Sequence, residues 1–256
     1  EAVLAVSKEV IGNADNYTAD EDFIFTLAKV DDTTSDTLPA DTTVTVKKGN
    51  GASFGAISYI APGTYYYTIT ETTGSEDDCM TNDTTAKYAK VVVGYNSGKT
   101  ALVVTSITYG ETQHDCDADE AATSLTVYNK YAKTTATIDV TKIMNGANAP
   151  DESFTFGIAK AAPSKTDAIS GDLSKTIKAT QTATCGPITY TEAGEYEYTI
   201  SETPGTTAGM TYASAKSVTV SVEQDPDTLA LTATVNYEAN KTAVEITNEY
   251  TRPEGE

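Results

Sequence analysis

An internal repeat constrains the fold of this chain more than any other feature of its sequence. The block GTYYYTITET at Gly63–Thr72 returns as GEYEYTISET at Gly194–Thr203. Three further blocks recur in the same order, as Leu4–Lys8 and Ile138–Lys142, Phe23–Leu27 and Phe154–Ile158, and Val127–Tyr131 and Ile246–Tyr250. The chain is therefore predicted to hold two copies of one domain, covering residues 1–132 and 133–256 and joined by a very short linker.

Each copy is predicted to consist of β-strands. Thr, Val, Ile and Tyr are abundant and favour strands, and no segment sustains a helical period. Tyr88–Tyr95 and Thr100–Tyr109 flank the turn Asn96–Lys99, which is typical of a hairpin. A second hairpin is predicted around Asp225–Asp227. The pattern indicates an all-β protein of two tandem immunoglobulin-like antiparallel β-sandwich domains, arranged end to end.

Three polar residues in each copy fall on the apolar face of their strands, because strand side chains alternate between faces. Lys8 alternates in phase with the apolar residues of the first strand, Glu71 with those of the central block, and Asn129 with those of the last strand. The second copy repeats this pattern with Lys142, Glu202 and Asn248. The sequence therefore predicts that a Lys, a Glu and an Asn point into the core of both domains.

Burying an unpaired charge is costly, so these inward-facing groups require an explanation. One reading is a buried Lys–Glu ion pair hydrogen-bonded to the Asn. The other is covalent: desolvation lowers the pKa of a Lys and raises that of a Glu, which leaves a neutral amine nucleophile and a protonated acid that hydrogen-bonds the Asn carbonyl. Attack on the Asn side chain would expel ammonia and leave an isopeptide bond, with folding supplying the effective concentration.

The ordered pattern of a Lys on the first strand, Gly-x-Tyr-x-Tyr-x-Ile-x-Glu in the middle and Asn-x-Tyr at the end resembles isopeptide-forming pilin domains. That family is related to the B-type repeats of a collagen adhesin, and two domains of this length resemble a major (backbone) pilin of the streptococcal T-antigen type. The resemblance implies Lys8–Asn129 and Lys142–Asn248 cross-links, with Glu71 and Glu202 as the catalytic residues. It also implies a structural shaft subunit of a secreted, cell-wall-attached pilus on a Gram-positive bacterium.

In that family, sortase joins pilin subunits head to tail by linking a C-terminal Thr to a Lys of the next subunit. This chain departs from the pattern, because Gly110–Ser124 contains no Lys and the chain ends without a sorting motif. With no signal peptide before Glu1, we expect a mature or trimmed form. Seven lysines remain as acceptor candidates: Lys47, Lys48, Lys87, Lys90, Lys99, Lys130 and Lys133. The alternative function is the stalk or ligand-binding region of a cell-wall-anchored adhesin, whose partner would be a host surface ligand.

The three cysteines suggest a disulfide in the first copy. Cys79 and Cys116 lie equally far from the centre of the Asn96–Lys99 turn, so an extended hairpin register would pair them, as an oxidising exterior allows. Cys185 is predicted to be a buried apolar thiol. A thioester between Cys185 and the nearby Gln181 is the alternative.

Charge and composition exclude several other functions. Asp and Glu number 37 against 17 Lys and Arg, and the net charge of −20 opposes binding to nucleic acid or to anionic membranes. With His114 as the single histidine, a His-based catalytic or metal site is not expected. The clustered acidic residues also lack the spacing of a calcium-binding loop. We therefore expect no metal, no cofactor, no membrane insertion and no enzymatic activity beyond self-cross-linking.

Overall fold

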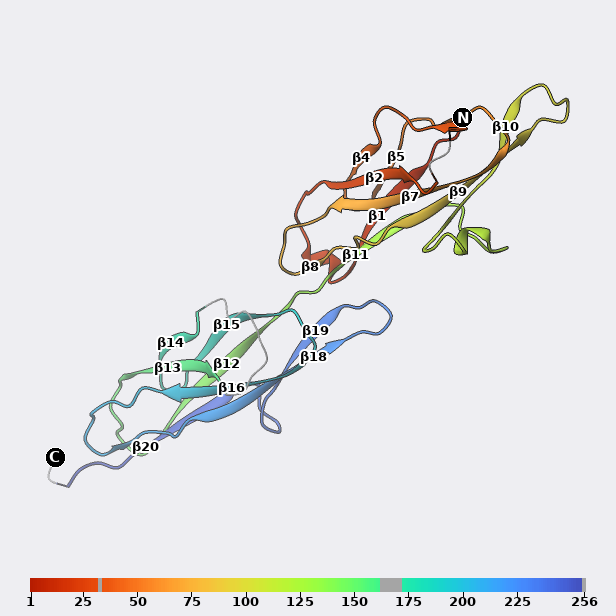
Figure 1. Ribbon diagram of the computed structural model, residues 1–256. Helices are drawn as coiled ribbons and strands as arrows, with labels where there is room; N and C mark the ends of the chain where they lie inside the picture. The colour runs from red at the N-terminus through yellow and green to blue at the C-terminus, as the bar shows by residue number, and fades with distance from the viewer. Residues whose placement is uncertain (32–33, 162–171, 255–256) are drawn as a thin grey trace. The chain divides into compact units, whose positions relative to one another are not determined.

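The computed structural model describes residues 1–31, 34–161 and 172–254. Strands account for nearly all of the regular structure, and the chain divides into two compact units, Glu1–Tyr131 and Ala132–Glu256 (Figure 1). The prediction of an all-β protein with two tandem sandwich domains is confirmed. Within the described residues, no helix is long and apolar enough to span a membrane.

The first domain packs two sheets around one core. Its four-stranded sheet has the order β5-β1-β11-β8, and its five-stranded sheet has the order β10-β9-β7-β2-β4. The four strands are β1 (Ala5–Gly12), β5 (Asn50–Ser53), β8 (Met80–Thr81) and β11 (Thr126–Tyr131). The five are β2 (Phe23–Lys29), β4 (Thr43–Val46), β7 (Gly63–Thr73), β9 (Lys87–Tyr95) and β10 (Leu102–Gly110). Short elements complete the domain: β3 (Asp36–Thr37), β6 (Ser58–Tyr59) and the 3-10 helices η1 (Ala14–Asn16) and η2 (Asp115–Asp117).

The second domain repeats this topology. Its sheets have the orders β15-β12-β20-β17 and β14-β13-β16-β18-β19, which match those of the first domain strand for strand. The four-stranded sheet contains β12 (Thr134–Asn145), β15 (Thr182–Tyr190), β17 (Met210–Thr211) and β20 (Val244–Tyr250). The five-stranded sheet contains β13 (Ser153–Lys160), β14 (Ser174–Lys178), β16 (Gly194–Glu202), β18 (Lys216–Gln224) and β19 (Leu231–Asn236). The repeated sequence blocks therefore correspond to equivalent strands.

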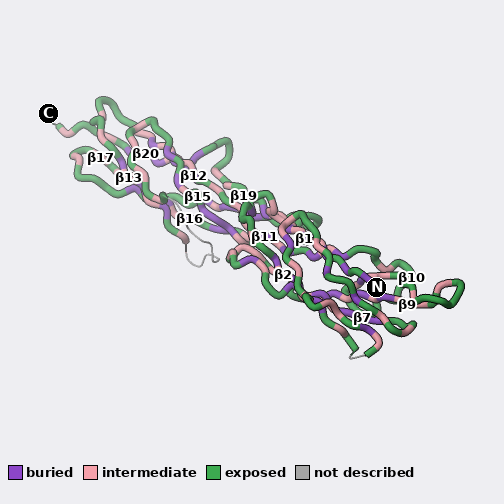
Figure 2. Tube along the Cα trace, turned by 90° about the horizontal axis from the view of Figure 1, so that it is seen from above, coloured by how far each residue is buried: buried purple, intermediate pink, exposed green. Residues whose placement is uncertain are grey.

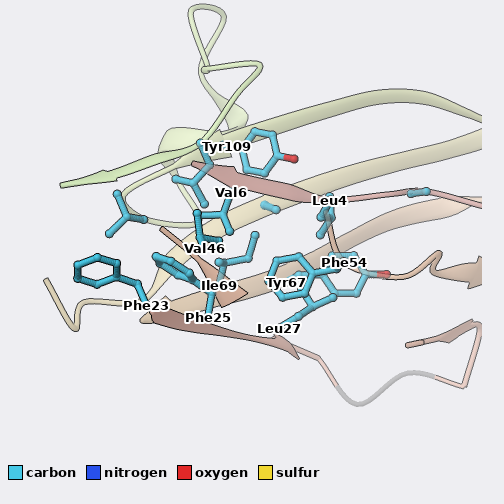
Figure 3. Packing of buried hydrophobic residues seen from close by; sticks show 14 of the residues in the cluster. Leu4, Val6, Phe23, Phe25, Leu27, Val46, Phe54, Tyr67, Ile69 and Tyr109 are labelled. Atoms are coloured by element: carbon cyan, nitrogen blue, oxygen red, sulfur yellow. The ribbon is translucent and has the colours of Figure 1, made fainter. Parts of the chain in front are cut away.

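The core of each domain follows the alternation of its strands. Along β7, inward-facing residues are buried and their neighbours are not, which is the pattern of a strand with one face on the core. Buried segments run along the strands while the loops are exposed (Figure 2). In the first domain, Phe25 and Leu27 of β2 lie beside Tyr67 and Ile69 of β7, and Val6 of β1 closes over them from the other sheet (Figure 3). Each such side chain contributes about 1.5–3 kcal/mol by its burial.

One strand pair in each domain is parallel, which the sequence did not predict. β1 pairs with β11, and β12 pairs with β20, so the first and last strands of each domain lie side by side in the same direction. A parallel pair needs a crossover of a dozen residues or more. Here the rest of the domain forms that crossover, so the pair joins the N-terminal and C-terminal strands of each domain.

The predicted disulfide between Cys79 and Cys116 is wrong, because no disulfide joins the described cysteines. The β9–β10 hairpin does form, but its register stops at Tyr88 opposite Gly110. Beyond those residues its two arms diverge. Cys79 precedes β8, which pairs with β11 in the other sheet, whereas the chain after β10 turns into η2, where Cys116 is buried and its thiol donates to the carbonyl of Thr112.

Candidate functional site

The parallel strand pair brings the predicted Lys and Asn together on the inner face of one sheet. Lys8 lies opposite Val127 in the register, and Asn129 is two residues further along β11, on the same face as Val127. In the second domain, Lys142 lies opposite Ile246, and Asn248 follows at the same spacing. All four of these polar side chains are fully buried.

The Glu comes from the facing sheet. Glu71 lies on β7 opposite Phe25, and Glu202 lies at the end of β16 opposite Phe156. Both carboxylates are shielded from solvent. Each domain therefore places a Lys and an Asn from the two inner strands of its four-stranded sheet across the core from a Glu on the central strand of the other sheet.

The carboxylate contacts both partners in each domain. In the first, Lys8 Nζ is 2.9 Å from Glu71 Oε2, and Asn129 Nδ2 donates to Glu71 Oε1 at 2.8 Å. In the second, Lys142 Nζ donates to Glu202 Oε2 at 3.1 Å, and Asn248 Nδ2 donates to Glu202 Oε1 at 2.8 Å. The structure thus brings all six predicted residues together as two equivalent triads.

Apolar neighbours surround the Lys amines. Lys8 Nζ lies 5.1 Å from the ring centre of Phe23, and Lys142 Nζ lies 4.6 Å from that of Phe154. Desolvation by this burial lowers the pKa of both Lys8 and Lys142 below the usual 10.5, although the adjacent carboxylates oppose the shift. At a given pH, the neutral amine, which is the nucleophilic form, is therefore more highly populated than on a surface Lys.

The orientation of the Asn carboxamide differs from the predicted one. We expected the Glu to hydrogen-bond the carbonyl oxygen, but the carboxylate accepts from the amide nitrogen instead. The carbonyl oxygen is already occupied, since Asn129 Oδ1 accepts from the backbone N–H of Asp83 at 2.8 Å and Asn248 Oδ1 from that of Ala213 at 2.9 Å. These donors are backbone groups just after β8 and β17, and no side-chain pattern reveals them.

A glycine three residues after each Glu permits a close approach of side chains, which involves the triad itself in the first domain. A Cβ on Gly74 would lie 2.5 Å from Glu71 Oε1, closer than real Cβ atoms come to other atoms. A Cβ on Gly205 would lie 2.3 Å from the hydroxyl oxygen of Tyr212. The repeated motif Glu-Thr-x-Gly at both positions was a sequence signal that could have marked this close approach.

The thioester alternative for Cys185 finds no support in the geometry. Cys185 is fully buried in the core of the second domain, opposite Ile138. Gln181 is exposed in the turn before β15, and its side-chain oxygen Oε1 accepts from the backbone N–H of Lys178. Burial also raises the pKa of the Cys185 thiol, which suits an inert apolar residue.

Fold and site together define a class of protein: tandem β-sandwich domains, each with a Lys–Glu–Asn triad on its first, central and last strands. The chain belongs to the FctA family, whose model, described as a Spy0128-like isopeptide containing domain, matches residues 4–132 and 138–251. This match covers most of both domains and confirms the resemblance predicted from the sequence.

Solved pilin structures are also similar to this chain along its length. The major pilin from Streptococcus pyogenes is 18% identical, with a TM-score of 0.44 over 97% of this chain and 98% of that one. The T-13 major pilin of the same species is 16% identical, with a TM-score of 0.40 over 97% and 95%. GBS52, the minor pilin of Streptococcus agalactiae, is 12% identical, with a TM-score of 0.26 over 99% and 98%. No curated protein matches the chain.

Proposed function

We propose that each domain locks itself with an intramolecular isopeptide bond, Lys8 to Asn129 and Lys142 to Asn248, and that Glu71 and Glu202 are the catalytic carboxylates. One observation carries the proposal. In both domains a buried Glu contacts the Lys amine with one oxygen and the Asn amide nitrogen with the other. A nucleophile, a proton carrier and an electrophile are thereby held within contact distance of one another.

The reaction begins with a proton transfer. In the desolvated site, transfer of a proton from the Lys ammonium to the Glu carboxylate replaces two buried charges with two neutral groups. The neutral Nζ then attacks Cγ of the Asn, and a C–N bond forms. The protonated Glu delivers its proton to Nδ2 and takes up one from the attacking nitrogen, so that the Cγ–Nδ2 bond breaks and ammonia leaves. No oxidant or external reactant is needed.

The backbone N–H of Asp83, or of Ala213 in the second domain, supports this reaction at the carbonyl oxygen. That oxygen gains negative charge when the amine attacks. The two N–H groups already lie within hydrogen-bonding distance of it, at 2.8 and 2.9 Å. A preorganised donor of this kind favours attack on a carboxamide, which is otherwise a poor electrophile.

Peptide mapping tests the proposed bonds directly. A digest of the denatured protein should yield two branched peptides, one joining the segment around Lys8 to that around Asn129 and one joining the segments around Lys142 and Asn248. Linear peptides with unmodified Lys8 and Lys142 would leave only the buried ion pair, and the cross-linking proposal would be wrong.

Membership of the FctA family supports a role as a pilus subunit, and we propose that this chain is a shaft subunit at the surface of a Gram-positive bacterium. Its partners would be other pilin subunits, joined head to tail by a sortase. Antibody against this chain should then detect a ladder of high-mass polymers in cell-wall extracts. A single anchored species would favour the alternative, the stalk or ligand-binding region of an adhesin.

Burial and ion pairing argue against one of the seven candidates for the acceptor Lys of that linkage. Lys87 is buried and pairs with Asp83 at 2.8 Å and also with Glu111. These two carboxylates raise its pKa although burial opposes them, so the amine stays protonated and enclosed. Lys87 is therefore a poor acceptor, and the more exposed members of the candidate set are the better ones.

A further inference from the structure

The two triads differ at the amide nitrogen of the Asn. Asn129 Nδ2 donates to two acceptors, Glu71 Oε1 and Asn82 Oδ1, each at 2.8 Å. Among the described residues, Asn248 Nδ2 donates only to Glu202 Oε1. If the proposed cross-linking holds, this nitrogen is the leaving group, so the two domains hold the same reacting atom in different ways.

We infer that Asn82 is a further residue of the cross-linking site in the first domain, where it holds and stabilises the leaving nitrogen of Asn129. This inference rests on the proposed function of the triads. It concerns one domain only, because the second domain has Tyr212 at the equivalent position after its Met-Thr strand.

The Asn82 side chain is fixed by its own contacts. Its Oδ1 accepts from the backbone N–H of Ser75 at 3.0 Å, and its Nδ2 donates to the carbonyl of Ser75 at 2.7 Å. Because both ends of the carboxamide are bound, its rotation is blocked and its oxygen remains directed at Asn129. The neighbouring Gly74 permits this approach, since a Cβ there would lie 2.4 Å from Asn82 Oδ1.

The contact grows stronger as the reaction proceeds. When Nδ2 receives its proton and begins to leave, it carries positive charge, and its hydrogen bond to Asn82 Oδ1 becomes charge-assisted. An interaction that is stronger in the transition state than in the ground state lowers the barrier. In the second domain, the Tyr212 hydroxyl is buried and has no hydrogen-bond partner among the described residues, so it supplies no matching contact.

The test follows ammonia loss from each domain of the full-length chain. Samples taken at intervals after translation is stopped are analysed by intact mass and peptide mapping, which separate the Lys8–Asn129 bond from the Lys142–Asn248 bond. Replacing Asn82 with Leu should slow the first-domain bond by about tenfold, the effect of one lost hydrogen bond of roughly 1.4 kcal/mol. The second-domain bond in the same molecule is the internal reference and should form at the wild-type rate.

Two further variants separate a role in the reaction from a role in folding. Asn82→Asp keeps an acceptor oxygen and should react within about threefold of wild type, a change smaller than the loss of one hydrogen bond. Tyr212→Phe is the matched control in the second domain and should leave both rates unchanged. If Asn82→Leu does not fold, Asn82→Ser, which cannot reach Asn129, takes its place with the same expected slowing.

The outcomes distinguish this inference from the proposed function. If the wild-type chain loses no ammonia, the proposed cross-linking itself is wrong. If wild type forms both bonds and Asn82→Leu forms the first-domain bond equally fast, only the role of Asn82 is overturned. Equal slowing in Asn82→Asp and Asn82→Leu would also overturn it, because the acceptor oxygen would then be irrelevant.

Discussion

At the scale of single residues, each domain contains a Lys that its environment makes unusually acidic. Full burial beside Phe23 or Phe154 disfavours the ammonium form of Lys8 and Lys142, and the adjacent carboxylate is the strongest of the groups that oppose this effect. A buried ion pair in such a place adds little net stability, because desolvation offsets its attraction. The proposed conversion of the Lys into an amide would remove that penalty permanently.

The pH dependence of stability should reveal the buried amine when the bond cannot form. In a Glu71→Ala variant, Lys8 loses the carboxylate that raises its pKa most, so its folded-state pKa falls further below 10.5. The unfolded state then binds more protons in the window below 10.5, so the free energy of unfolding should rise as pH increases from neutral toward that value. Urea denaturation at several pH values measures this slope.

Wild type is the control for this experiment. Its Lys8 nitrogen would be an amide that does not titrate, and apart from the Lys8–Asn129 bond it differs from the variant only in keeping the Glu71 side chain. The difference between the two proteins therefore reports on the Lys8–Glu71 pair. Parallel stability profiles for variant and wild type would contradict the assignment of Lys8 as the cross-linked residue.

At the scale of secondary-structure elements, the parallel pairing of first and last strands decides what a cross-link would do. Lys8 and Asn129 lie on hydrogen-bonded neighbours, β1 and β11, at opposite ends of the first domain's sequence. Force applied to the two ends of the domain would otherwise shear these strands apart. A covalent bond between them would carry the load instead.

Single-molecule pulling should therefore separate wild type from an Asn129→Ala variant. We expect the wild-type first domain to show no unfolding extension of its cross-linked segment, while the variant shows one additional extension event. Asn248→Ala should give the same result for the second domain. An extension event of full domain length in wild type would show that the strands are not covalently joined.

Strand alternation predicts much of this site but not its long-range parts. Period-two spacing along one strand is a local property, so the inward placement of Lys8, Glu71 and Asn129 is readable from the sequence. The pairing of β1 with β11 depends on contacts between distant segments. The backbone N–H of Asp83 has no sequence signature, and the predicted cysteine pairing was wrong because the hairpin register ends before it reaches those residues.

At the scale of the whole molecule, the chain consists of two compact units with the same topology and the same triad. Each unit has its own core cluster. Because each proposed bond closes nearly a whole domain into one loop, it restricts the unfolded chain of that domain strongly. The entropy model for cross-links gives about 4–5 kcal/mol for a loop of this size.

Calorimetry of the full chain should show that the two bonds act separately. Asn129→Ala should lower the unfolding transition of the first domain and leave that of the second domain in place. Asn248→Ala should do the reverse. A variant that lowers both transitions equally would contradict the division into independently locked domains.

The intact mass of the purified wild-type chain decides whether the two domains cross-link themselves. It should be lower than that of the unmodified sequence by two ammonia molecules, and Glu71→Ala and Glu202→Ala should each show a deficit of one ammonia. A wild-type mass equal to that of the unmodified sequence would contradict the claim that these domains cross-link themselves.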